Sequence, residues 1–161
     1  MARGMDIARV GRIVTAHGGR WAVWTDQGLV AVGTTRRQVL DTARAAGITD
    51  VTAADGANAP SVPDWRYLPD GFRGRVLRAC MRIPSGEVAP YADLARAAGS
   101  PGASRAAGSA VAGNPMPVII PCHRVVRSDG HLGAYSMGGA AVKARMLRAE
   151  GVSVQGDRIT G

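Results

Sequence analysis

Apolar and polar positions alternate along the first part of the chain in a pattern typical of β-strands. Three segments, 10–16, 21–25 and 29–32, are rich in β-branched and aromatic residues. Short glycine-containing stretches separate them and have the composition of turns. The pattern therefore predicts a hairpin followed by a third strand.

A helix is expected next, because the apolar residues change to a helical spacing. Thr35 and Gln38 have the spacing of a capping box at its start, and Gly47 ends it. Its apolar face consists of Val39, Leu40 and Ala43. Residues 48–51 have the composition of one more short strand. These elements predict a small α+β domain over residues 1–54.

Residues 55–70 change in character and are expected to be a linker. Four prolines or glycines and several small polar residues interrupt any regular pattern, and Trp65 and Tyr67 are candidate anchors. The remaining residues, 71–161, form the second predicted domain. No internal repeat is visible.

Most of the second domain has a helical pattern. Helices are predicted over 72–82, 90–98, from 100 to about 112, and from about 140 to 149, with an extended apolar segment at 116–121. The overall fold class is therefore α+β: a small sheet-and-helix domain followed by a mostly helical one.

The two central helices, joined at Gly99, are typical of a helix-turn-helix. The small side chains of the second helix would allow close approach to a DNA duplex, and Arg105 is its one long side chain. An ordinary alanine-rich core helix with a solvated arginine is the alternative interpretation.

Composition and charge narrow the class of protein. The chain has 161 residues, 46% of them hydrophobic, and a formal net charge of +8; this favours a folded protein with an anionic partner. Residues 70–150 hold 11 basic and 5 acidic residues, a net +6. The two cysteines exclude a disulfide framework and a four-cysteine zinc module. Without an apolar leader or a spanning segment, we expect a cytoplasmic, nucleoid-associated protein.

The segment Pro121–Val125 carries the strongest candidate for chemistry. Cys122 follows an apolar run and precedes His123 and Arg124, a basic setting that would lower the pKa of the thiol and produce a nucleophilic thiolate. A metal site is disfavoured, because no second Cys-His pair has ligand spacing. A cysteine protease is also disfavoured, because only two other histidines could supply a distant base.

The segment 114–126, Asn-Pro-Met-Pro-Val-Ile-Ile-Pro-Cys-His-Arg-Val-Val, resembles the O6-alkylguanine-DNA alkyltransferases almost residue for residue. The resemblance extends over about residues 70–151, half of the chain. Its other motifs are Gly86-Glu87, Tyr91 with Leu94-Ala95, Ala103 to Ala106 with Gly108, Tyr135-Ser136, and Lys143 to Gly151.

The resemblance implies a role for each matching residue. Cys122 is similar to the nucleophile that takes the alkyl group, His123 to its water-linked base, and Glu150 to the carboxylate that orients the histidine. Asn114 resembles the hinge between recognition helix and active-site strand. Tyr91 resembles the tyrosine that donates to the leaving guanine. The expected walls of the guanine and alkyl pocket are Val125, Tyr135, Ser136 and Met137.

The resemblance also implies the substrate and the partner. Arg105, with Ser104 beside it, resembles the arginine finger that fills the gap left by a flipped nucleotide. Phosphate contacts are expected from Arg73, Ser100 and Ser128. The implied reaction is direct, single-turnover repair of O6-alkylguanine, and also of O4-alkylthymine, in double-stranded DNA. No cofactor, metal or membrane is implied, and a monomer is expected, with cooperative assembly on DNA left open.

The sequence departs from the family pattern in three places. Residues 1–69 are short for the family's partner domain, so a trimmed ribonuclease-H-like domain is expected. Tyr135 and Lys143 are eight positions apart where seven is usual, which makes Met137 an extra residue in the pocket wall. We therefore expect a narrower pocket that reacts faster with methyl than with benzyl adducts. Pro90 stands where Ser or Thr is more usual.

Two other functions remain to be weighed against repair. A non-catalytic alkyltransferase-like protein would bind lesions without transferring the alkyl group, but those relatives replace the nucleophile that Cys122 supplies here. A helix-turn-helix regulator would use Cys122 as a sensor, but no second effector domain is visible. The sequence favours the alkyltransferase.

Overall fold

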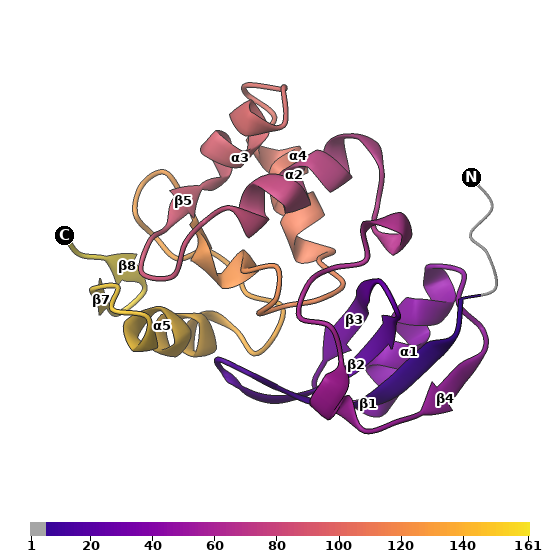
Figure 1. The fold of residues 1–161 in the computed structure, drawn as a ribbon. Helices are drawn as coiled ribbons and strands as arrows, with labels where there is room; N and C mark the ends of the chain where they lie inside the picture. The colour runs from indigo at the N-terminus through magenta and orange to yellow at the C-terminus, as the bar shows by residue number, and fades with distance from the viewer. Residues whose placement is uncertain (1–5) are drawn as a thin grey trace. The chain divides into compact units, whose positions relative to one another are not determined.

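The computed structural model describes residues 6–161 and divides them into two compact units (Figure 1). The first unit holds the described residues up to Pro69 together with Pro115–Ile119. The second unit holds Asp70–Asn114 and Ile120–Gly161. The described chain combines a small sheet with five α-helices, which agrees with the predicted α+β class.

A four-stranded sheet forms the centre of the first unit. Its strands are β1 (Ala8–Thr15), β2 (Gly18–Thr25), β3 (Gly28–Gly33) and β4 (Val51–Ala53), in the order β3-β2-β1-β4. The first three strands pair antiparallel and β4 pairs parallel to β1. The three strands predicted from alternation are present, although the first hairpin turn is tighter than expected because Gly18 and Gly19 belong to β2.

The helix α1 (Arg36–Ala45) packs on this sheet through Val39 and Ala43. The Thr35 side chain caps it, accepting from the Gln38 amide at 3.1 Å. The Gln38 side chain accepts from the amide of Thr34, at 3.0 Å, so only half of the predicted capping box forms. The expected strand at 48–51 starts only at Val51, because the Ile48 amide donates to the Ala43 carbonyl at the end of α1, at 3.0 Å.

The segment 55–70 forms two one-turn 3-10 helices, η1 (Gly56–Asn58) and η2 (Trp65–Tyr67). Tyr67 is buried in the core of the first unit and its hydroxyl donates to Asp6. Asp64 is only 3% exposed, and its carboxylate accepts from Thr25 Oγ1 at 2.6 Å and from Arg66 Nη2 at 2.7 Å. A buried carboxylate thus ties this segment to β2.

We expect Asp64→Asn to destabilise the protein by about 1–3 kcal/mol at neutral pH, because it removes a buried charge-assisted pair. Burial alone would raise the pKa of Asp64, but hydrogen bonds from Arg66 and Thr25 outweigh it and lower the pKa. The ionised form therefore stabilises the fold above the ordinary pKa of an aspartate, and this contribution is lost as the pH falls through the lowered value. Urea unfolding of both proteins from pH 7 to pH 2 measures it. A wild-type advantage that does not shrink in acid would contradict this assignment.

Helices form most of the regular secondary structure of the second unit. Its helices are α2 (Gly71–Met81), α3 (Tyr91–Ala97), α4 (Ser104–Ala112) and α5 (Ala140–Ala149). The start of α4 corrects the prediction of a helix from residue 100: Gly102 has φ +87°, a left-handed turn conformation that a helix cannot contain. The predicted extended segment at 116–121 contains no strand.

Two short pairings in this unit were not predicted. The strand β5 (Ala89–Pro90) pairs parallel to β6 (Val125–Val126), and β7 (Val154–Gln155) pairs antiparallel to β8 (Arg158–Ile159). Each strand has only two residues, too few for an alternating pattern to be visible in the sequence. The first pairing places the start of α3 beside the segment that follows Cys122.

Candidate active site

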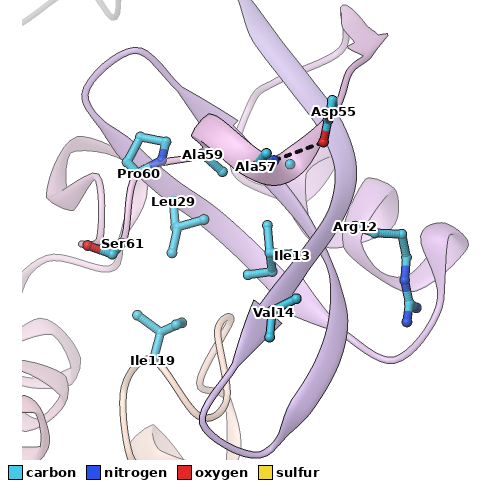
Figure 2. A pocket seen from close by; sticks show the side chains of 11 residues that line it. Arg12, Ile13, Val14, Leu29, Asp55, Ala57, Ala59, Pro60, Ser61 and Ile119 are labelled. Atoms are coloured by element: carbon cyan, nitrogen blue, oxygen red, sulfur yellow. Dashed lines mark hydrogen bonds between the residues drawn. The ribbon is translucent and has the colours of Figure 1, made fainter.

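A cavity of about 430 Å³ in the first unit is lined by none of the predicted catalytic residues (Figure 2). Leu29, Ile13 and Ile119 contribute apolar side chains to its wall, and Asp55 at its edge accepts from the Ala57 amide at 3.0 Å. No thiol and no histidine lines it. The predicted catalytic residues all lie in the second unit.

Cys122 opens the 3-10 turn η3 (Cys122–Arg124), directly before β6. Pro121, with φ −80° and ψ 66°, makes an inverse γ-turn in which the Cys122 amide donates to the Ile120 carbonyl at 2.8 Å. The cysteine is 5% exposed. The turn thus holds a thiol that is nearly buried.

The side chain of Asn114 holds this turn in place through hydrogen bonds. Its side-chain amide donates to the Ile120 carbonyl at 2.8 Å and also hydrogen-bonds the Cys122 sulfur. Between these residues the chain passes through a tight bend in which Val118 has φ +77°, a strained value for a β-branched residue. Asn114 therefore links the end of α4 to Cys122, and its role as a hinge remains a prediction.

His123, Glu150 and Arg124 form one buried network. His123 is fully buried, and its Nε2 lies 2.8 Å from Glu150 Oε1. Arg124 donates to the same carboxylate through Nε and Nη2, at 2.9 Å each, and to the Ile83 carbonyl at 2.7 Å. Because the Glu150 carboxylate accepts the hydrogen bond from Nε2–H of His123, the other ring nitrogen, Nδ1, carries no proton and is the basic one. The structure thus joins His123 to Glu150, and their roles in proton transfer remain predictions.

The prediction that a basic setting lowers the pKa of Cys122 is wrong for the free protein. Burial raises the pKa of the thiol, and this effect exceeds the lowering from Asn114, Lys143 and the nearby backbone amides. Arg124 does not supply the positive charge, because Glu150 and Ile83 occupy its guanidinium. Cys122 therefore rests as a thiol, and a base would have to remove its proton before the sulfur could act as a nucleophile.

Lys143 is the functional candidate that the sequence analysis missed. Its ammonium is fully buried and donates to the carbonyls of Val125 and Leu132, at 2.6 and 2.5 Å. Burial lowers the pKa of Lys143 to about 8, although the Cys122 and Cys80 sulfurs oppose this. Its position on the apolar face of α5, beside Met146 and Leu147, is the signal that could have indicated burial.

The side chain of Tyr91, the first residue of α3, lies among these groups. Lys143 Nζ is 6.0 Å from the centre of its ring, and a methyl group added at Gly133 would lie 3.4 Å from its hydroxyl. Burial raises the pKa of Tyr91, with smaller contributions from Cys122 and Cys80. The hydroxyl therefore keeps its proton at neutral pH and can act as a donor.

The other expected pocket residues differ in exposure. Val125 and Tyr135 are buried, Met137 is half-buried, and Ser136 is exposed.

The expected DNA-contacting side chains lie at the surface of the same unit, with Arg105 and Ser104 in the first turn of α4. Arg73 and Ser128 are exposed and Ser100 is half-buried. The structure thus brings Cys122, His123, Glu150, Asn114, Tyr91 and Lys143 together in the second unit, and the roles of the expected DNA-contacting residues remain predictions.

Within the described residues of the second unit, no three His, Cys, Asp or Glu side chains have ligand atoms close enough to hold a metal ion. Among residues 6–161, no helix is long and apolar enough to cross a membrane. The side chains of this site supply a thiol, a histidine, a carboxylate, a phenol and a buried ammonium.

Comparisons with known proteins show the family to which the chain belongs. Residues 71–152 match the model of a family described as 6-O-methylguanine DNA methyltransferase, DNA binding domain. The methylated-DNA–protein-cysteine methyltransferase of Mus musculus is 45% identical over 101 residues, 62% of this chain and 48% of the mouse protein. The Methanothermobacter thermautotrophicus protein of the same name is 48% identical over 86 residues, 53% of this chain and 47% of its own. The chain thus spans about half the length of these relatives.

A solved structure extends the similarity beyond the matched residues. The Mycobacterium tuberculosis OGT in complex with DNA has a TM-score of 0.60 and 26% identity, and the alignment covers 89% of this chain and 91% of that one. Both units therefore resemble parts of one known fold.

Proposed function

Since residues 71–152 place this chain in the 6-O-methylguanine DNA methyltransferase family, we propose that it repairs DNA by moving the alkyl group of O6-alkylguanine onto its own Cys122. O4-alkylthymine is a second substrate in this proposal. One observation carries it: a buried cysteine, locked by Asn114, stands next to a histidine that a buried carboxylate orients. A non-catalytic lesion-binding protein has no need of this nucleophile.

The proposed reaction is a displacement at the alkyl carbon. The thiol proton of Cys122 passes through water to His123, whose charge Glu150 stabilises. The sulfur then forms a bond to the alkyl carbon while the bond from that carbon to the guanine oxygen breaks. The Tyr91 hydroxyl donates a hydrogen bond to the leaving guanine, which takes up one proton, so the proton gained by the base balances the proton lost by the thiol. The product is a thioether, so each molecule acts once.

Substrate access requires that the damaged nucleotide leave the duplex. We propose that α3 and α4 act as a helix-turn-helix, with Arg105 entering the base stack and Arg73, Ser100 and Ser128 contacting phosphates. The exposed position of Arg105 in the first turn of α4 supports this. The backbone at Val125 and Ser136 would then read the flipped guanine, with Tyr135 and Met137 beside it. For the first unit, we propose a trimmed ribonuclease-H-like domain.

The test is the intact mass of the protein after incubation with a duplex that carries one O6-methylguanine. The expected result is a mass increase of one methyl group, with an equal amount of guanine restored in the DNA. A stable complex without any mass change would instead favour a lesion-binding protein. Sequence-specific binding to undamaged DNA would favour a regulator.

We expect Arg105→Ala to slow repair of duplex DNA by about 10-fold or more, while reaction with free O6-benzylguanine changes little. Only the duplex requires extrusion of the base, which costs a few kcal/mol. Rates on both substrates measure the effect, and Arg96→Ala, which removes an exposed arginine paired with Asp93, is the matched control. Equal losses on both substrates would assign Arg105 to the fold or the pocket.

A further inference from the structure

The C-terminal hairpin formed by β7 and β8 is the feature of the second unit that the proposed reaction leaves unexplained (Figure 1). It lies beyond the residues matched by the family model, which end at 152. Two-residue strands do not form a stable hairpin by themselves in water. Contacts with the rest of the unit must therefore hold it in place.

Most of the hairpin's backbone hydrogen bonds to the rest of the unit go to one short strip of the loop after β6, residues 129–132, and Arg148 of α5 also donates to the Val154 carbonyl at 3.1 Å. The Leu132 amide donates to the Asp157 carbonyl at 2.7 Å, and the Ile159 amide donates to the Gly130 carbonyl at 2.9 Å. Arg158 Nη2 adds a bond of 2.8 Å to the Asp129 carbonyl. The hairpin thus binds the backbone of residues 129–132 much as an added strand would.

Apolar side chains of the hairpin strengthen the same contact. Val154 and Ile159 pack on a buried cluster that contains Leu132 and Leu147. Leu132 is fully buried, and Lys143 Nζ donates to its carbonyl at 2.5 Å. The backbone of Leu132 is therefore held on both sides, at N–H by the hairpin and at C=O by the lysine.

The residue that follows this strip lies beside Tyr91, in the wall of the proposed base pocket. Gly133, the residue after Leu132, has φ +76° and passes so close to Tyr91 that an added methyl group would lie 3.4 Å from the hydroxyl and 3.7 Å from Cε2. Lys143 also lies over the Tyr91 ring. The position of Leu132 thus sets how closely the loop leading to Tyr135 and Met137 approaches the tyrosine.

We propose that the β7–β8 hairpin is a specificity-determining element. It holds residues 129–132 in place, and with them Gly133 near Tyr91, and so limits the size of the alkyl group that the site accepts. The proposal rests on the proposed alkyl transfer. A looser hairpin lets Gly133 move away from Tyr91, and the pocket widens for bulky adducts while the nucleophile and its partners stay in place.

The test compares Ile159→Ala and Ile159→Pro with wild type in the full chain. Alanine removes the apolar contact, and proline also removes the N–H that bonds Gly130. Gln155→Ala, an exposed change on the same hairpin, is the matched control. The readout is the ratio of the rates with duplexes carrying O6-benzylguanine and O6-methylguanine, with hydrogen exchange at the Leu132 amide as a second measurement.

The expected result is a benzyl-to-methyl rate ratio at least about 5-fold higher in Ile159→Pro, smaller but in the same direction in Ile159→Ala, and unchanged in Gln155→Ala. Exchange at Leu132 should accelerate in the same order. A ratio that stays constant while exchange accelerates, or while both rates fall together, would overturn the proposal and leave the hairpin a stabilising role only. If Ile159→Pro does not fold, the ratio in Ile159→Ala decides. A wild-type protein that reacts with neither duplex contradicts the proposed function itself.

Discussion

We expect Cys122→Ala and Cys122→Ser to abolish the proposed alkyl transfer, while Cys80→Ala keeps it. Cys122 is the thiol that Asn114 hydrogen-bonds and that stands next to His123, so its loss removes the atom that forms the new bond. Cys80 lies fully buried on α2, and burial raises its pKa well above the ordinary value. Because Cys80 is fully buried, an alkylated base cannot reach its sulfur.

Intact mass and peptide mapping after incubation with methylated duplex measure this result. Cys122→Ser is the sharper variant, because it keeps the size of the side chain and lowers only its nucleophilicity. Binding of the methylated duplex by both Cys122 variants should remain, which separates loss of chemistry from loss of recognition. A methyl group found on the Cys80 peptide would show that the nucleophile is wrongly assigned.

Glu150→Gln is expected to slow alkyl transfer by about 100-fold or more and to destabilise the fold by about 3 kcal/mol. The carboxylate accepts from His123 and twice from Arg124 within a site that is nearly closed to solvent. A neutral amide cannot stabilise a protonated His123, and it leaves the Arg124 guanidinium without its counter-charge.

The matched control for this variant is Glu87→Gln, an exposed change in the same unit. Single-turnover rates with methylated duplex and urea unfolding curves separate the two effects, provided the rates are measured where both proteins are folded. Asp at position 150 keeps the charge but shortens the side chain, so Glu150→Asp should recover part of the stability and less of the rate. A Glu150→Gln protein with an unchanged rate would exclude Glu150 from the proton path.

Local sequence determined most of the secondary structure. Alternation of apolar residues predicted β1, β2 and β3, and helical spacing predicted α5 with the observed bounds, Ala140–Ala149. These signals succeed because each element needs one apolar face toward its own core, and that face repeats along the chain. The start of α4 was missed, because Gly102 adopts a turn that the residue types around it do not exclude.

The candidate nucleophile was also visible in the sequence, since Pro121 to Val125 is a contiguous motif. Its partners were predictable only by resemblance, because Glu150 lies far along the chain from His123 and meets it through the packing of α5 against η3. The hairpin that holds residues 129–132 gave no signal, because backbone hydrogen bonds carry no residue signature.

The tertiary structure alone decided the electrostatics of the site. The sequence places Arg124 next to the Cys122 thiol, but in the fold its guanidinium binds Glu150. The Lys143 ammonium is instead the charge that lowers the pKa of the thiol. Burial then raises the pKa of Cys122 and lowers that of Lys143. The sequence by itself determined which residues could react. The charge state of each depends on how much water the surrounding elements exclude and on which partners they bring close, and only the folded chain fixes both.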